Sequence, residues 1–284
     1  MKYKDKPLVS IISINYNGLV LTRGLLESLR NISYPEVEIL VVDNGSQEAP
    51  DTLLEEFPEI KLVKSEQNLG FAGGNNLGMQ HAQGDFFLLI NNDVEVDPNF
   101  LEPLVSVMLT HPEVGIISPK IVYHYAQDTI QYAGGRAINL MTGRGSFVGS
   151  KAKDDGTYDT SGYTELAHGA AMMIRREVVQ KVGMKAGFQL WYEAGSRILH
   201  KEYMTVGKLS PLKSYYMNRN RVAFMRRHAK GWKKSFSIFW FMLISLPSQT
   251  LRYLLKGQRE LILPMFRGAI WNFKNQVKFP NPAL

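Results

Sequence analysis

The chain has 284 residues, of which 45% are hydrophobic and 11% aromatic, and it contains no Cys. This length allows one large α/β domain with an appendage, and the apolar content excludes wholesale disorder. The lack of Cys excludes disulfide frameworks, thiol nucleophiles and thiolate metal sites.

The charge is divided unevenly along the chain. Residues 211–284 contain 14 Lys and Arg against one acidic residue, Glu260, which is a net charge of +13. The first 210 residues contain 19 basic and 25 acidic residues, a net charge of −6. We therefore predict an α/β domain over residues 1–210 and a basic helical region over residues 211–284.

Short apolar runs alternate with amphipathic runs up to Ser118. The predicted strands are Leu8–Ile14, Val37–Val42, Ile60–Val63, Phe86–Ile90 and Val114–Ser118. The predicted helices between them are Leu19–Leu29, Thr52–Phe57, Asn75–His81 and Phe100–Leu109. This alternation is typical of an α/β fold with a mostly parallel, Rossmann-like sheet and helices on both faces.

After Pro119 the sequence becomes rich in Gly, Tyr and Thr as far as Gly162, which predicts irregular hairpins. Regular elements then resume. We expect strands at Ala170–Ile174 and Phe188–Tyr192, and helices at Arg176–Val182 and Ser214–His228.

Polar residues cluster at the ends of three predicted strands. Asn15 follows the first strand, Asp43–Ser46 the second, and Asn91–Asp93 the fourth. Ligands of open α/β sheets bind outside the carboxyl ends of the strands. Any one cluster alone is better explained as a turn, but three at one edge favour a binding site. Asp43 is well placed to accept hydrogen bonds from a base or a ribose.

The loop Asn68–Asn76 is rich in Gly and opens a helix. Its backbone amides are suited to approach a phosphate closely. The spacing differs from the GxGxxG fingerprint, and a simple loop leading into a helix explains the composition almost as well.

Asn91, Asn92 and Asp93 supply hard oxygen ligands, which suit Mg²⁺ or Mn²⁺ bound together with a diphosphate. Asp93 is the expected metal ligand. Asp97 precedes Pro98 and is better explained as the N-cap of the next helix.

These clusters, taken in order with His168–Met172 and the pair Arg175–Arg176, resemble the family 2 glycosyltransferases. The similarity covers roughly Pro7–His200 and is greatest to the bacterial rhamnosyltransferase-like branch. It implies a GT-A fold that binds a nucleoside diphosphate sugar and transfers the sugar with inversion.

The resemblance also implies roles for individual residues. Asn15 and Asp43 match contacts to the base and ribose, and Asn68 and Asn75 match part of the nucleotide-sugar pocket. The full expected pocket is Asn15, Asp43, Asn44, Ser46, Asn68, Gly70, Gly73, Asn75, Asn92 and His168.

The expected metal ligands are Asp93, Asn91 and His200. Asn91 stands in place of the first Asp of the family's D-x-D motif, which weakens the negative charge offered to Mg²⁺ or Mn²⁺. His200 matches a late His that touches the metal or the diphosphate in related enzymes, although a solvent-facing His at a strand end is about as well supported. His168 is expected near the sugar and the acceptor, and tight strand packing is the alternative reason for the small residues after it.

The family places its catalytic base in an acidic, aromatic segment shortly after the Arg175–Arg176 stretch. Here Met184 is followed directly by Lys185, and no such segment exists. Gly183 and Gly187 are both typical of helix ends, with no helix between them. The catalytic base is therefore unassigned, and neither Glu165 nor Glu193 has more than a weak claim to the role.

The basic region also carries an apolar run. Phe236–Leu246 provides 11 residues before Pro247, short of the ~20 needed to span a bilayer. Flanking Lys and Arg favour a helix or helical hairpin lying in the interface of an anionic membrane, with Trp232, Trp240 and Trp271 as anchors. A core helix or a homo-oligomer interface is the second interpretation. Nucleic acid is not expected as a partner, because it gives no reason for the apolar run.

Together these features predict a metal-assisted glycosyltransferase at the cytoplasmic face of the cell membrane. The expected acceptor is a polysaccharide or another glycan, or a lipid-linked molecule, and the donor suggested by the branch resemblance is dTDP-rhamnose. Because the base segment is missing, a nucleotide-sugar-binding or scaffold protein without transferase activity is the alternative. A nucleic-acid-binding protein with an unrelated nucleotide fold is the third interpretation.

Overall fold

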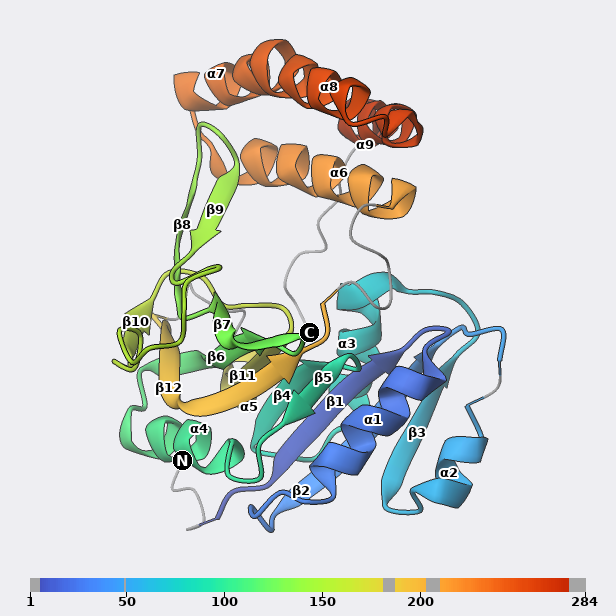
Figure 1. The fold of residues 1–284 in the computed structure, drawn as a ribbon, viewed down its shortest axis with the longest axis vertical. Helices are drawn as coiled ribbons and strands as arrows, with labels where there is room; N and C mark the ends of the chain where they lie inside the picture. Colours follow the sequence, from blue (N-terminus) through green and yellow to red (C-terminus); the bar gives the residue numbers. More distant parts are fainter. Residues whose placement is uncertain (1–5, 49, 181–186, 203–209, 276–284) are drawn as a thin grey trace. The chain divides into compact units, whose positions relative to one another are not determined.

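The computed structural model describes residues 6–48, 50–180, 187–202 and 210–275 (Figure 1). The chain separates into two compact units. The first comprises residues 1–136 and 147–205, and the second comprises Ala137–Ser146 and residues 206–283. A hairpin tip in the middle of the sequence thus groups with the C-terminal helices.

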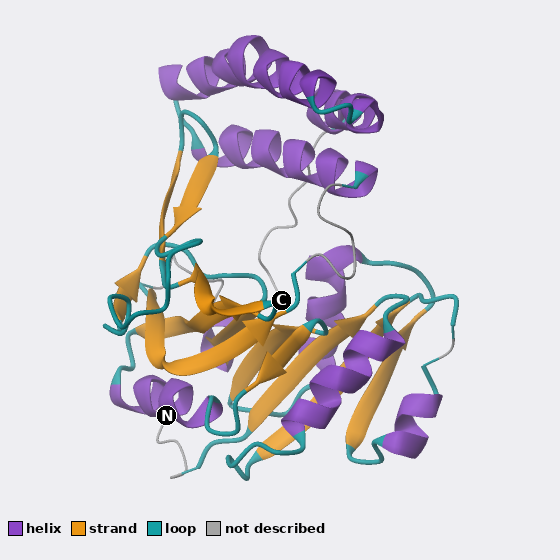
Figure 2. Ribbon diagram, in the orientation of Figure 1, coloured by secondary structure: helices purple, strands orange, loops and turns teal. Residues whose placement is uncertain are grey.

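The first unit contains a ten-stranded mixed sheet whose long path has the order β10-β12-β6-β11-β4-β1-β2-β3. Helices cover both faces of this sheet (Figure 2). The strands of the N-terminal half are β1 (Val9–Asn15), β2 (Val37–Asn44), β3 (Ile60–Ser65), β4 (Phe86–Asn91) and β5 (Val94–Val96). Those of the second half are β6 (Val114–Tyr123), β7 (Ala126–Tyr132), β10 (Gly162–Thr164), β11 (Ala171–Arg175) and β12 (Gln189–His200).

The helices of the first unit are α1 (Leu19–Leu29), α2 (Thr52–Glu56), α3 (Gly70–His81), α4 (Leu101–Thr110) and α5 (Arg176–Gln180). Apolar residues of α1, α2 and α4 join one core cluster, while α3 and α5 pack into a second. α3 lies very close to the sheet, since a Cβ at Gly78 would be 2.4 Å from Cγ2 of Ile12. The predicted α/β class is confirmed.

The parallel pairs β1–β2, β1–β4 and β2–β3 bring their carboxyl ends to one edge of the sheet. Asn15 is opposite Asp43 in the β1–β2 register, and Ile14 is opposite Asn91 in the β1–β4 register. This register determines which polar residues meet at the edge.

Several predicted boundaries were wrong, and one strand was missed. α3 begins at Gly70 rather than Asn75, because Asn68 and Asn44 accept the first loop amides and support an earlier start. The strand predicted to end at Tyr192 continues as β12 to His200, with an irregularity between Glu193 and Arg197. β5 was not predicted, and it pairs antiparallel with the end of β12.

The pair Arg175 and Arg176 closes the carboxyl ends of two helices. The guanidinium of Arg175 donates to the carbonyls of Met108, His111 and Val114 at 2.6–3.2 Å. That of Arg176 donates to the carbonyls of Ala82 and Gly84. Helix carboxyl ends carry unpaired carbonyls and partial negative charge, so both cations stabilise the fold.

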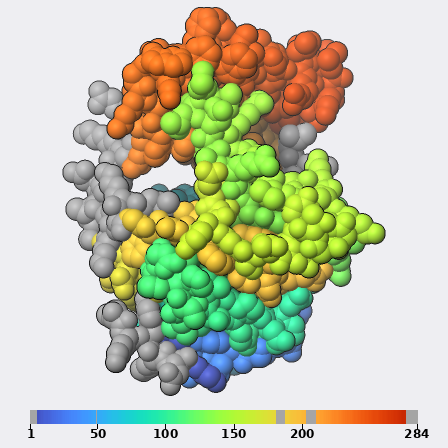
Figure 3. Space-filling view, turned by 90° about the vertical axis from the view of Figure 1, so that its left-hand side faces the viewer, coloured from blue at the N-terminus to red at the C-terminus, as the bar shows by residue number. Residues whose placement is uncertain are grey.

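The second unit contains the tip Ala137–Ser146 of the hairpin formed by β8 (Gly135–Asn139) and β9 (Arg144–Phe147), and a set of helices. The helices are α6 (Pro211–His228), α7 (Trp232–Trp240), the π-helix η2 (Phe241–Ser245), α8 (Leu246–Leu255), the 3₁₀ turn η3 (Arg259–Leu261) and α9 (Ile262–Lys274). A core of buried apolar side chains joins α6, η2, α8, η3 and α9. Figure 3 shows the green hairpin tip against the orange helices.

The helical path of the apolar run Phe236–Leu246 continues through Pro247. The π-helix Phe241–Ser245 directly precedes α8, in which this proline is the second residue. Its wider turn accommodates the missing N–H and the bulk of the ring, which an α-helical interior does not. In the part of the chain that is described, no helix is both long and apolar enough to cross a membrane.

Candidate active site

A hydrogen-bonded network joins the ends of β1 and β2. The amide nitrogen of Asn15 donates to Oδ1 of Asp43 at 2.9 Å and to Oγ of Ser46 at 3.2 Å. The backbone N–H of Ser46 in turn donates to Oδ2 of Asp43. Gly45 makes the turn between them with a φ of +76°, and a Cβ there would lie 2.7 Å from the Gln67 backbone.

Asp43 is a buried carboxylate that keeps free hydrogen-bonding capacity. Its side chain accepts from Asn15 and Ser46, and among the described residues it forms no ion pair. A carboxylate has about four acceptor positions. The remaining positions suit the N–H or O–H donors of a base or a ribose.

The loop before α3 is held to the end of β2 by two amide side chains. Nδ2 of Asn44 donates to Oδ1 of Asn68 at 3.1 Å, and Oδ1 of Asn44 accepts from the N–H of Leu69. Oδ1 of Asn68 also accepts from the N–H of Gly70. These two loop amides are therefore used inside the protein, where the sequence suggested that they approach a phosphate.

Asn75 and Asn92 are both buried and use their amide nitrogens within the fold. Nδ2 of Asn75 donates to the Phe71 carbonyl in the first turn of α3. Nδ2 of Asn92 donates to Oγ1 of Thr22 at 3.1 Å. Gly73 packs against Leu69, whose Cβ would lie 2.7 Å from a Cβ at that position.

Thr22 connects the ends of β1 and β4, a role that the sequence did not predict. Its hydroxyl donates to Oδ1 of Asn15 at 3.0 Å and accepts from Asn92. A continuous chain of hydrogen bonds thus runs from Asn92 through Thr22 and Asn15 to Asp43. A Thr inside an amphipathic helix gives no sequence signal for this role.

Asp93 and His200 meet near the same edge. Nε2 of His200 lies 3.2 Å from Oδ1 of Asp93, and Nδ1 lies 2.7 Å from Oε1 of Gln131. All three side chains are buried. β5 and β12 position the pair, because His200 is opposite Val94 in their antiparallel register.

The donor set fits a divalent cation. With Oε1 of Gln131 accepting, Nδ1 of His200 carries a proton, and Nε2 faces Oδ1 of Asp93 either as an N–H donor or, when it carries no proton, with its lone pair. Two acceptors at this distance need a proton or a metal ion between them. Adjacent ligands of an octahedral ion with bonds of about 2.1 Å lie roughly 3 Å apart.

The protein ligands are few. Among the described residues no group of three or more His, Asp and Glu side chains could hold a metal ion. Asn91, the last residue of β4, is half-buried, and its backbone N–H donates to the Ala170 carbonyl at 2.9 Å. An ion on Asp93 and His200 would take other ligands from waters or a diphosphate.

His168 lies beside His200 in an aromatic cluster. The ring centroid of His168 is 6.1 Å from that of His200, 4.7 Å from that of Phe147 and 5.5 Å from that of Tyr132. Burial, with a smaller contribution from His200, lowers the pKa of His168 to about 3. Nδ1 accepts from the N–H of Ala170 at 3.0 Å, so the neutral ring carries its proton on Nε2.

The predicted gap between Met184 and Lys185 lies outside the described residues. Of the two nearby carboxylates, Glu193 is engaged: Oε1 accepts from Ser161 and the N–H of Gly195, and Oε2 accepts from Trp191. Glu165 is exposed beside β10. The contacts of Glu193 do not indicate a role as the base.

The sequence of this chain is similar to those of known proteins. The sequence model described as "Glycosyl transferase family 2" matches residues 10–183. The O-antigen biosynthesis protein RfbC of Myxococcus xanthus is 33% identical over 195 residues, which is 63% of this chain and 15% of that protein. The putative glycosyltransferase EpsH of Bacillus subtilis is 31% identical over 36% of this chain and 30% of its own length. The match therefore spans well under half of these relatives.

Solved structures share the fold. The mannosyltransferase PcManGT from Pyrobaculum calidifontis, in complex with GDP-Man and Mn²⁺, has a TM-score of 0.55 and 15% identity, covering 94% of this chain and 87% of that chain. TarS 1–349 of S. aureus, in complex with UDP-GlcNAc, has a TM-score of 0.52 and 18% identity, covering 90% and 79%. At these identities the likeness concerns the fold alone, and it agrees with the predicted GT-A class.

Proposed function

We propose that this chain, which belongs to glycosyl transferase family 2, binds a nucleoside diphosphate sugar at the carboxyl ends of β1, β2 and β4 and transfers the sugar with inversion. The main evidence is that two buried groups, the Asp43 carboxylate and the Asp93–His200 pair, lie at the same edge of the sheet. One group suits a nucleoside, and the other suits its diphosphate.

In this proposal Asp43 accepts hydrogen bonds from the nucleoside, and Asn15 and Ser46 hold the carboxylate in place. Asn44 and Asn68 shape the loop that borders the nucleotide, together with Gly70. His168 lies toward the sugar as a neutral ring with one N–H donor.

Asp93 and His200 would hold Mg²⁺ or Mn²⁺, with Asn91 adjoining them. The cation would neutralise the negative charge that develops on the leaving nucleoside diphosphate. Support comes from the facing acceptors of the pair and from the Mn²⁺ that accompanies GDP-Man in the PcManGT complex.

The acceptor hydroxyl needs a base, which we leave unassigned. The family match ends at residue 183, just before the junction of Met184 and Lys185, and Glu193 is held by three hydrogen-bond donors. These observations favour a second candidate function, in which the chain binds the donor without transferring the sugar.

We propose a glycan or lipid-linked acceptor at the cytoplasmic face of the membrane, and dTDP-rhamnose as the donor. The name of RfbC supports the acceptor class, and the similarity to the rhamnosyltransferase-like branch is the reason for the donor. The second unit supports membrane association through exposed apolar side chains on α7, η2 and α8: Trp232, Phe236, Phe239, Trp240, Leu243, Ile244, Leu251, Leu254 and Leu255.

Donor binding and transfer are tested separately. Calorimetry with dTDP-rhamnose, UDP-GlcNAc and GDP-mannose, with and without Mn²⁺, should reveal metal-dependent binding of one donor. Transfer of the sugar to an acceptor in membrane extracts is then followed by NMR of the anomeric carbon. Binding with transfer supports the enzyme, and binding without transfer supports the second candidate. Failure of all three donors at millimolar concentration, with their parent nucleotides also unbound, contradicts both.

Membrane association is tested by flotation with vesicles containing anionic lipid. A triple variant Phe239→Ser, Leu251→Ser, Leu255→Ser should lose recovery with the vesicles, because apolar burial and charge act together in interfacial binding. The control Leu212→Ser, Met217→Ser changes exposed apolar residues of α6. If the triple variant still floats with the vesicles but no longer self-associates in sedimentation, the exposed apolar residues of α7, η2 and α8 would instead form a homo-oligomer interface.

A further inference from the structure

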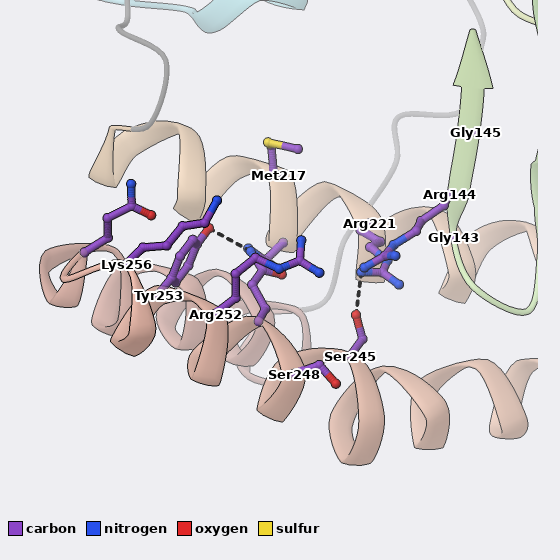
Figure 4. A pocket seen from close by; sticks show the side chains of 13 residues that line it. Gly143, Arg144, Gly145, Met217, Arg221, Ser245, Ser248, Arg252, Tyr253 and Lys256 are labelled. Atoms are coloured by element: carbon purple, nitrogen blue, oxygen red, sulfur yellow. Dashed lines mark hydrogen bonds between the residues drawn. The ribbon is translucent and has the colours of Figure 1, made fainter. Parts of the chain in front are cut away.

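The second unit contains a cationic pocket that the proposed reaction does not use. The cavity has a volume of about 590 Å³ and lies among α6, α8 and the tip of the β8–β9 hairpin (Figure 4). Four of its lining residues are basic, namely Arg144, Arg221, Arg252 and Lys256. Hydroxyl and amide groups of Ser245, Ser248, Gln249 and Tyr253 contribute to its polar lining.

The positive charge of this pocket lacks a compensating acidic side chain in the part of the chain that the structure describes. None of the four basic side chains forms an ion pair there. The segments of the second unit contain 16 Lys and Arg in sequence and a single acidic residue, Glu260. Like charges held together without an anion raise the energy of the folded state.

Arg221 is fixed at the wall of the pocket. Its Nε and Nη2 donate to the Thr142 carbonyl, and its Nη1 donates to Oγ of Ser245 at 2.8 Å. The guanidinium also lies 4.8 Å from the centroid of the Phe241 ring. These partners are neutral, so they orient the cation without cancelling its charge. Burial, followed by the charge of Arg144, lowers the pKa of Arg221 to about 10.

Several polar and basic residues in and next to α8 are spaced so that they all face the pocket. Ser245 at the end of η2, Gln249 and Arg252 in α8, and the C-cap residue Lys256 follow one another at three or four residues and so lie on one side of this helical segment. Exposed Leu251 and Leu254 belong to other positions of the same helix. The pocket therefore presents a polar, cationic surface distinct from the exposed apolar residues.

We propose that this pocket binds a phosphate or diphosphate group of a ligand. Guanidinium groups offer paired donors that match phosphate oxygens, and hydroxyls add further donors. Several cations around one cavity favour a multiply charged anion over a single carboxylate. This site goes beyond the transfer reaction and does not depend on it, because its occupancy needs neither the donor nor a divalent cation.

The test measures binding of inorganic pyrophosphate to the full chain by calorimetry, in EDTA and at low salt. Arg252→Gln with Lys256→Gln should weaken binding at least about tenfold. Both side chains are exposed, so the fold should persist, and circular dichroism checks this. Arg221→Lys should also weaken binding, because it keeps the charge and loses the paired donors.

The matched control is Lys233→Gln with Lys234→Gln, which removes the same charge from exposed positions of α7 outside the pocket. It should change the affinity less than about threefold. An equal loss in this control, or no pyrophosphate binding at millimolar concentration, overturns the proposal. Glucuronate binding as tight as pyrophosphate binding also overturns it.

Farnesyl diphosphate, used below its micellar concentration, distinguishes the sources of the anion. If farnesyl diphosphate binds more tightly than pyrophosphate, and the double variant of Arg252 and Lys256 loses this binding, the pocket is assigned to a lipid-linked diphosphate. Equal binding of the two assigns it to a soluble one. Both outcomes support a diphosphate site, and they differ only in the molecule that carries the group.

Discussion

Nε2 of His200 lies 3.2 Å from Oδ1 of Asp93, although the two residues are 107 positions apart in the chain. The antiparallel pairing of β5 with the end of β12 makes this contact. Because Gln131 occupies Nδ1, the imidazole directs its second nitrogen at the carboxylate. The two atoms can share a proton or a cation, and the consequences of our proposal that they hold a cation can be measured.

The substitution Asp93→Asn should remove the metal-dependent part of nucleotide affinity. It preserves the size of the side chain and removes the charge that a hard cation requires. We expect the Mn²⁺-dependent affinity for the bound nucleoside diphosphate to fall at least about tenfold, measured by calorimetry. Asp97→Asn is the control, because Asp97 is partly exposed and forms an ion pair with Arg197 at 3.4 Å. Unchanged affinity in Asp93→Asn would contradict the assignment.

Gln131 should act as a positioning residue for His200. Gln131→Leu removes the acceptor of the Nδ1 proton, so the ring loses its fixed orientation. The Mn²⁺ concentration for half-maximal donor binding should rise about tenfold or more, while binding without metal stays constant. Gln131→Glu retains an acceptor and should largely restore the metal response. Equal behaviour of the two variants would indicate a packing role alone.

Thr22 should couple the two ends of the nucleotide site. Thr22→Val leaves Oδ1 of Asn15 and Nδ2 of Asn92 without their buried partner. We expect a loss of about 1–3 kcal/mol in the free energy of unfolding and weaker nucleotide binding. Thr110→Val is the matched control, because the exposed Thr110 bonds mainly to carbonyls of its own helix. Denaturant unfolding compares the two variants, and an equal loss in both would contradict the coupling role.

Arg175 should contribute more to stability than its neighbour. Arg175→Met leaves the buried carbonyls of Met108, His111 and Val114 without their charged donor. We expect this to lower the free energy of unfolding by about 3 kcal/mol. Arg176→Met removes two carbonyl contacts at a less buried position and should cost about 1–2 kcal/mol. Urea unfolding monitored by circular dichroism gives both values. The reverse order would show that capping of α4 is not the main role of Arg175.

Lys120 should make stability sensitive to alkaline pH. Burial lowers the pKa of its ammonium, but hydrogen bonds and charges of Asp159 and Asp154 outweigh this and raise the pKa above 10.5. The folded chain thus holds this proton more tightly than the unfolded chain. The contribution is complete below pH 10.5 and is lost as the pH rises through the folded-state value. The variant Lys120→Met should have a lower free energy of unfolding at about pH 8. Its free energy of unfolding should also fall less steeply with rising alkaline pH than that of the unchanged chain.

The sequence by itself determined the fold class, most strands and the polar clusters. Alternating apolar runs had a clear period, and Asn15, Asp43 and Asn91 are indeed the last or nearly last residues of parallel strands. Local sequence carries such information, because strand burial and strand-end turns depend on neighbouring residues. The start of α3 at Gly70 and the continuation of β12 beyond Tyr192 depended on distant partners and were predicted wrongly.

Only the tertiary structure decided which polar groups are engaged within the fold and which stay available. Asn92 bonds to a helix hydroxyl, Gln131 orients His200, and Arg221 shares a pocket with a hairpin residue far away in sequence. None of these contacts follows from residue spacing, since each joins segments brought together by strand pairing or helix packing. The residue types indicated the chemistry, and the packing determined where it is available.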